Sequence, residues 1–258
     1  TGGKLAVTFL NIGEGDSVFI RSASGVQVLI DGGKNRAVIR ELSKVMPWYD
    51  RTIDVVIGTH PDQDHIGGLP DVLVRYRVSL VMRSSVLDEE GADFKAFNQS
   101  IAEEKKEGAQ EIVAERGQII DIGDGTYIEI IFPDRDVPNL ETNTGSIVAR
   151  LVYGNTAFML TGDSPQNIEE YLVRLDGEQL KSNVLKAGHH GSRTSSSPLF
   201  VGFVSPEHVV FSRGCNNSYG HPHQEVVDLF AKFEIQTFDT CKDGAVSFVS
   251  DGKTIFAK

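Results

Sequence analysis

Short apolar runs recur along the whole chain and alternate with polar, glycine-containing turns. Runs of this length, rich in valine, isoleucine and phenylalanine, predict β-strands. The predicted strands are residues 5–10, 17–21, 26–31, 53–57, 78–82, 127–132, 147–153, 156–160, 183–187, 207–211, 244–249 and 253–257. Because helical signals fall between these runs in both halves of the chain, we expect two sheets packed face to face with helices outside.

Two segments carry the periodicity of an amphipathic helix. In the charge-rich residues 93–107, Phe94, Phe97 and Ile101 recur at helical spacing. We expect these side chains to enter the core rather than to stack on nucleic acid bases. Residues 228–233 predict a second helix of the same kind.

A dense group of ligand-type side chains follows the apolar run 53–57. The sequence there reads THPDQDH and places His60, Asp62, Asp64 and His65 within six consecutive positions. Without a cation, these groups would repel and desolvate one another on one tight turn. At a strand end His60 and Asp62 point the same way and can meet one ion, while Asp64 and His65 can face a second. A helix cap is the alternative, but capping needs one carboxylate and explains neither histidine.

Two later apolar runs also end in candidate ligands. Asp163 follows residues 156–160 and, taken alone, could equally cap the helix that we expect after it. His189 and His190 end the run 183–187, where adjacent side chains point to opposite sides. One imidazole can therefore reach an ion while the other faces away or meets a substrate.

The remaining histidines carry less information. His221 lies between Gly220 and Pro222 in a polar loop, and in isolation it is typical of a surface histidine. His208 and His223 belong to no recognisable pattern, so we expect surface or loop positions for both.

Taken in order, these motifs resemble those of the metallo-β-lactamase superfamily, whose usual signature is HxHxDH. Asp62 replaces the second histidine, as in ComEC-type DNA-uptake proteins. Residues 5–20 resemble the FLDVGQGD opening of those proteins, with Asn11 and Glu14 in place of the usual Asp and Gln. The other matching segments are VLIDGG at 28–33, MLTGD at 159–163, KAGHHGS at 186–192 and YGHP at 219–222. The resemblance covers nearly the whole chain and implies an α/β (α+β) fold, the four-layer αββα sandwich.

The resemblance also implies a role for each motif residue. The metal ligands would be His60, Asp62, Asp64, His65, Asp163 and His190. Asp163 would bridge two divalent ions, while Asp16 and Asp31 would hold the ligands in place without binding the ions. The superfamily usually adds a histidine from the middle of the chain, but none occurs between His65 and His189.

The segment that matches this missing ligand is ETNTGS, residues 141–146. Its oxygen donors would replace imidazole nitrogen, and oxygen donors favour harder ions. We therefore expect two divalent ions, with manganese slightly ahead of zinc, and no small organic cofactor. Asn143 and Ser146 are expected to contact the substrate.

The expected chemistry is hydrolysis of a phosphodiester. Two cations about 3.5 to 4 Å apart lower the pKa of a water molecule and stabilise charge on the reacting oxygens. We expect Asp64, His189 and His221 to be catalytic, with His221 or His189 protonating the leaving oxygen. Arg193 and Ser192 are candidate phosphate contacts, although a solvated loop arginine is an equally good interpretation of Arg193.

The resemblance makes single-stranded DNA the expected substrate, cleaved during DNA uptake. Two alternatives stay open. One is another hydrolase on the same fold, acting on a β-lactam, a lactone or a small phosphodiester. The other is a non-enzymatic part of an uptake channel that binds metal and DNA.

Charge limits how nucleic acid could bind. The chain has 25 basic and 36 acidic residues and a net charge of −11, so general counterion release cannot hold a strand. We expect Lys186, Arg193 and Arg213 to form a local positive funnel with the ions. No linker divides the chain, and its hydrophobic content of 40% suffices for a single domain over residues 1–258.

Two cysteines and the absence of long apolar runs bear on the compartment. Cys215 and Cys241 could form one bridge outside the cytoplasm or remain free thiols. No apolar run approaches the length of a membrane helix, and no signal peptide precedes Leu5. We expect a domain of a larger membrane protein, on the extracytoplasmic side of the membrane. A secreted or a cytoplasmic protein stays open.

Overall fold

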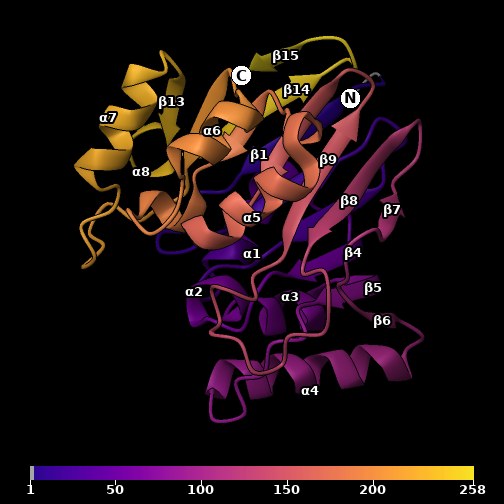
Figure 1. Ribbon diagram of the computed structural model, residues 1–258. Helices are drawn as coiled ribbons and strands as arrows, with labels where there is room; N and C mark the ends of the chain where they lie inside the picture. Colours follow the sequence, from indigo (N-terminus) through magenta and orange to yellow (C-terminus); the bar gives the residue numbers. More distant parts are fainter. Residues whose placement is uncertain (1–2) are drawn as a thin grey trace.

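The computed structural model describes residues 3–258 and contains two sheets (Figure 1). The first has the strand order β15-β14-β1-β2-β3-β4-β5-β6, and the second β13-β12-β11-β10-β9-β8-β7. The strands of the first sheet are β1 (Leu5–Phe9), β2 (Val18–Arg21), β3 (Gln27–Ile30), β4 (Thr52–Gly58), β5 (Arg77–Arg83), β6 (Gln110–Val113), β14 (Val246–Ser250) and β15 (Ile255–Ala257). Those of the second are β7 (Ile119–Asp121), β8 (Thr126–Phe132), β9 (Val148–Tyr153), β10 (Thr156–Leu160), β11 (Val184–Lys186), β12 (His208–Phe211) and β13 (Gln236–Asp239).

The main core lies between the two sheets. Alternate residues of the strands point inward and meet there, for example Phe9, Phe158 and Phe248, all fully buried. Phe248 packs edge-on against the other two rings, with centroids 6.1 Å away in each case. This apolar layer joins strands from the beginning, middle and end of the chain.

Helices cover the outer face of each sheet. The first is covered by α1 (Ala37–Val45), α3 (Leu69–Arg75) and α4 (Ala92–Lys106), with the short α2 (Gln63–Ile66) beside them. The second is covered by α5 (Gln166–Asp176), α6 (Pro198–Val204) and α7 (Gln224–Lys232), and α8 (Thr240–Asp243) follows β13. Two 3₁₀ turns, η1 (Gly177–Leu180) and η2 (Gly188–Gly191), complete the elements. The four-layer αββα sandwich is confirmed.

Each predicted strand overlaps an observed one, but β6, β7 and β13 are additional. These three are short, and most of their side chains reach solvent, so they lack an apolar run. The predicted helix 93–107 is α4, with Phe94, Phe97 and Ile101 buried as expected. The helix predicted at 228–233 is α7, which begins four residues earlier at Gln224.

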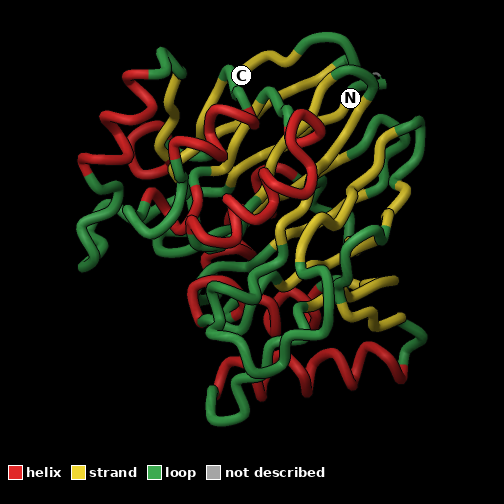
Figure 2. The backbone as a smooth tube through the Cα atoms, in the orientation of Figure 1, coloured by secondary structure: helices red, strands yellow, loops and turns green. Residues whose placement is uncertain are grey.

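The loops that carry the sequence motifs leave the carboxyl ends of β3, β4, β10 and β11. These strands run parallel within their sheets, β3 beside β4 and β10 beside β11, so their ends lie at one edge of each sheet. Figure 2, in the orientation of Figure 1, draws these connections in green together with the other loops and turns. This edge of the sandwich therefore collects side chains that are far apart in the sequence.

The expectation for His208 is wrong. His208 lies on β12, not in a loop, and its ring packs on Phe238 and Phe248 with centroids 5.7 and 5.5 Å away. Its strand passes over the core, where aromatic neighbours cover the imidazole. His223 does lie in a loop, directly before α7.

Candidate metal centre

Asp31 organises the loop that leaves β4. Its backbone takes a φ of 58°, and its Oδ1 accepts a hydrogen bond of 2.8 Å from Thr59 N. Oδ2 accepts from Thr59 Oγ1 at 2.7 Å and lies 2.8 Å from His65 Nδ1. Because an ionised carboxylate can only accept, His65 Nδ1 carries a proton, and Nε2 is the ring nitrogen that can offer a lone pair to an ion.

His60 and His190 are oriented in the same manner. His60 Nδ1 lies 3.0 Å from Thr59 Oγ1 and 3.3 Å from Ser146 Oγ. His190 Nδ1 donates to the Ser212 carbonyl at 2.9 Å, which again leaves the lone pair on Nε2. The outer nitrogen of each ring is thus held by the protein.

The inner nitrogens show that the residues fit a metal ion. The Nε2 atoms of His60, His65 and His190 are buried and have no hydrogen-bonding partner within residues 3–258. A buried imidazole nitrogen without a partner costs free energy, and a coordinated cation removes that cost. Nitrogen lone pairs and carboxylates facing one another are the donor set of a divalent metal.

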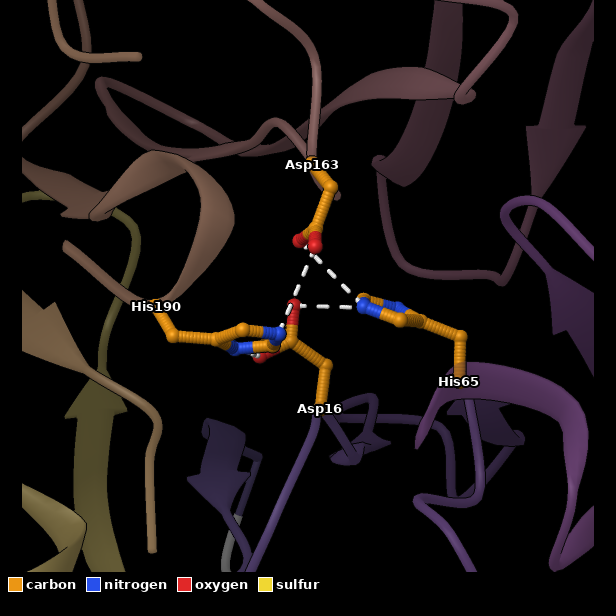
Figure 3. A group of neighbouring side chains, drawn as sticks. All are labelled: Asp16, His65, Asp163 and His190. Atoms are coloured by element: carbon orange, nitrogen blue, oxygen red, sulfur yellow. Dashed lines mark ion pairs between the residues drawn. The ribbon is translucent and has the colours of Figure 1, made fainter. Parts of the chain in front are cut away.

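Asp163 lies between these imidazoles (Figure 3). Its Oδ1 is 3.2 Å from His65 Nε2, and its Oδ2 is 3.3 Å from His190 Nε2 and 3.5 Å from His189 Nε2. Helix α5 begins after Pro165, so Asp163 does not cap it. Burial alone would raise the pKa of Asp163, but His190 and His65 hold that pKa well below its ordinary value.

Asp62 and Asp64 face the centre from the loop after β4. Asp62 Oδ2 lies 3.7 Å from His60 Nε2, and Asp64 Oδ2 lies 3.2 Å from His190 Nε2. Asp62 precedes α2, but its side chain makes no cap hydrogen bond, so the helix-cap interpretation fails. Burial raises the pKa of Asp62, whereas for Asp64 the histidines His190 and His65 outweigh burial and lower the pKa.

The donors lie in two adjacent groups. His60 and Asp62 form one group, and Asp64, His65, Asp163 and His190 form the other. The ring centroids of His60 and His65 lie only 4.0 Å apart. Burial and the neighbouring His65 keep the pKa of His60 well below its ordinary value. For His65, burial is outweighed by Asp163 and Asp31, which raise the pKa.

Asp16 adjoins the centre and lies next to the outer nitrogen of His190. Ligand atoms of Asp16, His65, Asp163 and His190 all lie within 4.8 Å of one another (Figure 3). Asp16 Oδ1 is 3.2 Å from His190 Nδ1. Burial would raise the pKa of Asp16, but Lys186 and His190 lower it to about 2.

Lys186 supplies a fixed positive charge. Its buried ammonium donates to the Gly162 carbonyl at 2.7 Å, lies 3.3 Å from Asp163 Oδ1 and pairs with Asp16 Oδ2. Burial favours a lower pKa, but Asp16 and Asp163 raise it, so the side chain is charged. Lys186 therefore holds two carboxylates of the centre.

The expected positive funnel does not form. Lys186 is buried among carboxylates, and Arg213 donates to Asp239 Oδ2 at 3.0 Å and 2.6 Å. Only Arg193 of the three is exposed, with Glu225 Oε1 4.0 Å away. Basic residues near the motifs in sequence are thus mostly used in internal ion pairs.

The histidine doublet follows a tight turn rather than a strand end. His189 and His190 both have positive φ, 48° and 55°, within η2. The His189 ring is partly exposed and lies 5.5 Å from that of His221. Burial lowers the pKa of His189, and burial with the neighbouring His190 lowers that of His221 to about 4.

The other expected substrate residues lie around this group. Ser192 Oγ accepts from Thr194 Oγ1 at 2.9 Å within its own loop. Asn143 Oδ1 is buried without a hydrogen bond to any residue that the structure describes. Ser146 lies behind His60 and also accepts from Asp163 N at 3.2 Å, so it orients both.

A hollow of about 290 Å³ adjoins the centre. Asp62, Asp64, Asp88 and Asp93 line it, and Tyr219 lies at its side with its ring stacked on His221. The hollow is therefore strongly acidic before any cation binds.

A disulfide fastens the segment that carries His221. Cys215 and Cys241 are bridged, which decides between the two states left open by the sequence. The bridge ties the loop after β12 to α8.

Comparison with known families decides the identity of the fold. Residues 10–210 match the family model of the metallo-beta-lactamase superfamily. The chain belongs to the metallo-β-lactamase superfamily. The centre described above lies at the edge of the sandwich where the HxHxDH loop of this superfamily is found, with Asp62 as the variant residue.

The curated relatives are competence proteins of the ComEC type. Competence protein ComA of Neisseria gonorrhoeae is 32% identical over 249 residues, covering 95% of this chain and 32% of the relative. ComE operon protein 3 of Bacillus subtilis is 28% identical over 264 residues, covering 94% and 32%. The chain thus spans about a third of the length of these relatives.

Solved structures agree on the fold. Igni18, described as a novel metallo hydrolase from the archaeon Ignicoccus hospitalis, superimposes with a TM-score of 0.61 at 16% identity, covering 94% of this chain and 98% of the other. In this metallo-β-lactamase domain, no helix within residues 3–258 is both long and apolar enough to cross a bilayer.

Sequence reasoning missed the supporting residues of the centre. Lys186 was expected only to contribute to a positive funnel, and Thr59 and Ser212 were given no role, although Lys186 and Thr59 are the first residues of the KAGHHGS and THPDQDH segments. Their position beside His190 and His60 was the available signal. Ser212 has no such signal, because only its carbonyl is used.

Proposed function

We propose that this chain is a metal-dependent phosphodiesterase that cleaves single-stranded DNA during DNA uptake. The observation that carries the proposal is the position of three buried imidazole Nε2 atoms, which have no hydrogen-bonding partners in the described chain, beside the carboxylates of Asp62, Asp64 and Asp163. The family and this centre support a metal-dependent hydrolase. The names of the competence relatives motivate DNA as the substrate.

In this proposal the centre would hold two divalent ions. His60 and Asp62 would hold one, Asp64, His65 and His190 would hold the other, and Asp163 would serve both. Such a pair lowers the pKa of a water molecule and stabilises charge on the phosphoryl oxygens. Asp31 keeps His65 in the required tautomer, and Lys186 holds Asp16 and Asp163.

His189 and His221 are the proposed residues for proton transfer between the attacking water and the leaving oxygen. Because their pKa values are lowered, both imidazoles are neutral near pH 7. A neutral imidazole can accept the proton of the attacking water and return it to the leaving oxygen. Arg193, Ser192 and Asn143 remain the proposed contacts to substrate, of which Arg193 is the exposed cation suited to a phosphate. Ser146, expected as a fourth contact, is fully buried and instead orients His60 and Asp163.

A small phosphodiester is the second candidate substrate. The acidic hollow beside the centre opposes a polyanion more strongly than a ligand with a single phosphate. Manganese stays slightly ahead of zinc, because the mid-chain histidine is absent and three of the six proposed ligands are carboxylates.

The disulfide supports a place outside the cytoplasm. Disulfides persist in oxidising compartments, and Cys215 and Cys241 are bridged. We propose that the domain works on the extracytoplasmic side of a membrane, beside the channel of a larger uptake protein. The named relatives, about three times as long as this chain, motivate that association.

The test is cleavage of end-labelled single-stranded DNA by metal-stripped protein resupplied separately with manganese, zinc or magnesium. We expect one metal to restore cleavage and Asp64→Ala to abolish it, while Asp93→Ala, in the same hollow, retains it. Cleavage that survives metal removal would contradict the mechanism. If the protein binds metal but none of the three metals restores cleavage of the DNA, the small-substrate or channel-scaffold interpretation replaces this one.

A further inference from the structure

A hollow lined by three arginines and three glutamates lies at the far end of β4 from the metal centre. Arg51, Arg75 and Arg77 line it, in a volume of about 820 Å³ between α3 and α4. Arg77 N donates to Arg51 O at 2.8 Å, so two of these residues are backbone neighbours. The seven residues of β4 separate Arg51 from the loop that carries His60, a distance of roughly 20 Å.

The three arginines have no acidic partner in the chain between residues 3 and 258. The arginine ion pairs there involve Arg36, Arg40, Arg83, Arg116, Arg135, Arg193 and Arg213. On the opposite wall, Glu103 pairs with Lys106 and Glu104 accepts from Val78 N. Within residues 3–258, neither Glu104 nor Glu107 on that wall forms an ion pair with a basic residue. Three unpaired guanidinium groups in one hollow repel one another, and an anionic ligand removes this repulsion.

Exposed aromatic side chains lie beside the arginines in the sequence. Trp48 and Tyr49, just before Arg51, are 83% and 70% exposed, with ring centroids 5.8 Å apart. Trp48 is the single tryptophan of the chain. Guanidinium groups that contact phosphates, together with open aromatic faces for bases, are the usual elements of a single-strand binding surface.

We propose that this surface, formed by Trp48, Tyr49, Arg51, Arg75 and Arg77, binds single-stranded nucleic acid. It rests on the proposed function, because it would hold a distant part of the strand that is cleaved at the metal centre. A bilayer with anionic headgroups offers similar phosphates. A flat bilayer does not fill a hollow, however, whereas a single strand can enter it.

The single tryptophan allows a direct test. Metal-loaded protein is titrated with a phosphorothioate-linked oligothymidylate of about 20 nucleotides, which resists cleavage, while Trp48 emission is followed. We expect saturable quenching that weakens with salt. The triple variant Arg51→Gln/Arg75→Gln/Arg77→Gln lacks the three guanidinium charges and should bind the strand at least tenfold more weakly. The slope of the logarithm of its binding constant against the logarithm of the salt concentration should be less steep by about 2.

A matched control removes three exposed charges elsewhere. The variant Arg174→Gln/Lys232→Gln/Lys253→Gln changes the net charge equally, and none of these residues lines the hollow. Equal losses in both triple variants would overturn the proposal, as would binding of a labelled strand without a change in Trp48 emission. A blue shift with anionic phospholipid vesicles, and no response to the strand, would assign the hollow to lipid.

A second assay on the wild type and the arginine triple variant distinguishes failure of this inference from failure of the proposed function. Hydrolysis of bis(p-nitrophenyl) phosphate reports on the metal centre alone, and the arginine triple variant should retain it. Quenching without hydrolysis would contradict the phosphodiesterase and leave the binding surface standing. Hydrolysis without quenching would contradict the binding surface and leave the phosphodiesterase standing.

Discussion

Lys186 is the residue whose removal should most disturb the metal-free centre. Its ammonium is the buried cation between Asp16 and Asp163, so Lys186→Met leaves two carboxylates uncompensated. We expect the free energy of unfolding to fall by about 3 to 5 kcal/mol, the usual cost of breaking a buried pair. Urea denaturation of metal-free protein measures it, with the exposed Lys181→Met as control. Adding Asp16→Asn should restore part of the loss, and an equal loss in the single and double variants would refute the pairing.

Gly15 should be irreplaceable because no space is left for a side chain at this position. A Cβ there would lie 1.7 Å from the Asp64 carbonyl oxygen, so Gly15→Ala must displace the Asp64 ligand loop. Gly13 has a similar φ, +84° against +97°, but its Cβ position is open, which makes Gly13→Ala a control for left-handed strain alone. We expect metal affinity, measured by calorimetry, to fall at least tenfold in Gly15→Ala only. Similar affinities in both variants would show that the contact is unimportant.

Single residues also show what the sequence could reveal of the centre. His60, Asp62, Asp64 and His65 are adjacent in the chain, so their chemistry is visible without a fold. The Ser212 carbonyl that fixes the tautomer of His190 is brought there only by folding. Backbone groups carry no sequence signature, which is why such partners could not be predicted.

Among the elements, α5 should confer a measurable pH dependence. Glu169 on this helix accepts from Ser196 N and Ser197 N, at 2.7 and 2.6 Å, and so holds the loop after the histidine doublet. Burial raises the pKa of Glu169 to about 7, against the weaker lowering by Ser197 and Ser196. The folded state then binds this proton more tightly than the unfolded state does. Its contribution to stability is therefore largest below about pH 4.5 and falls by about 3 kcal/mol as the pH rises to 7.

Glu169→Gln tests this dependence because an amide does not titrate. The difference in unfolding free energy between wild type and variant, from urea denaturation, should change across that pH range. The neighbouring Glu170→Gln should run parallel to wild type. Parallel curves for Glu169→Gln as well would mean that the carboxylate stays ionised throughout.

Elements with two buried faces were predictable, whereas of the edge strands β15 was predicted and β6, β7 and β13 were missed. The central strands β3 and β10 are buried at every position and appear in the sequence as unbroken apolar runs. At the sheet edges, β6 and β13 expose most of their side chains, so solvent leaves no pattern to detect. Their pairing depends on the strand beside them, which a local pattern cannot show.

At the scale of the whole molecule, the expectation of a positive funnel was wrong because nearness in sequence does not show which basic residues are already paired. A net charge of −11 says how many charges exist, not which are already paired. Lys186 and Arg213 are used internally, while Arg51, Arg75 and Arg77 stay unpaired at the opposite end of the first sheet. The placement of charge follows from topology, since β4 and β5 bring the last two together with Arg51.

The disulfide should link stability of the whole molecule to its redox surroundings. Cys215 and Cys241 are 26 residues apart, and closing a loop of that size restricts the unfolded chain by about 3 kcal/mol. A reductant should therefore lower the urea midpoint of the wild type and leave that of Cys215→Ser/Cys241→Ser unchanged. If the reductant has no effect on the wild type, the thiols are free in solution and the argument for an oxidising compartment is lost. If the midpoint falls as expected, a reducing cytoplasm would deprive the fold of this stabilisation, because the loop that carries His221 would lose its covalent tie to α8.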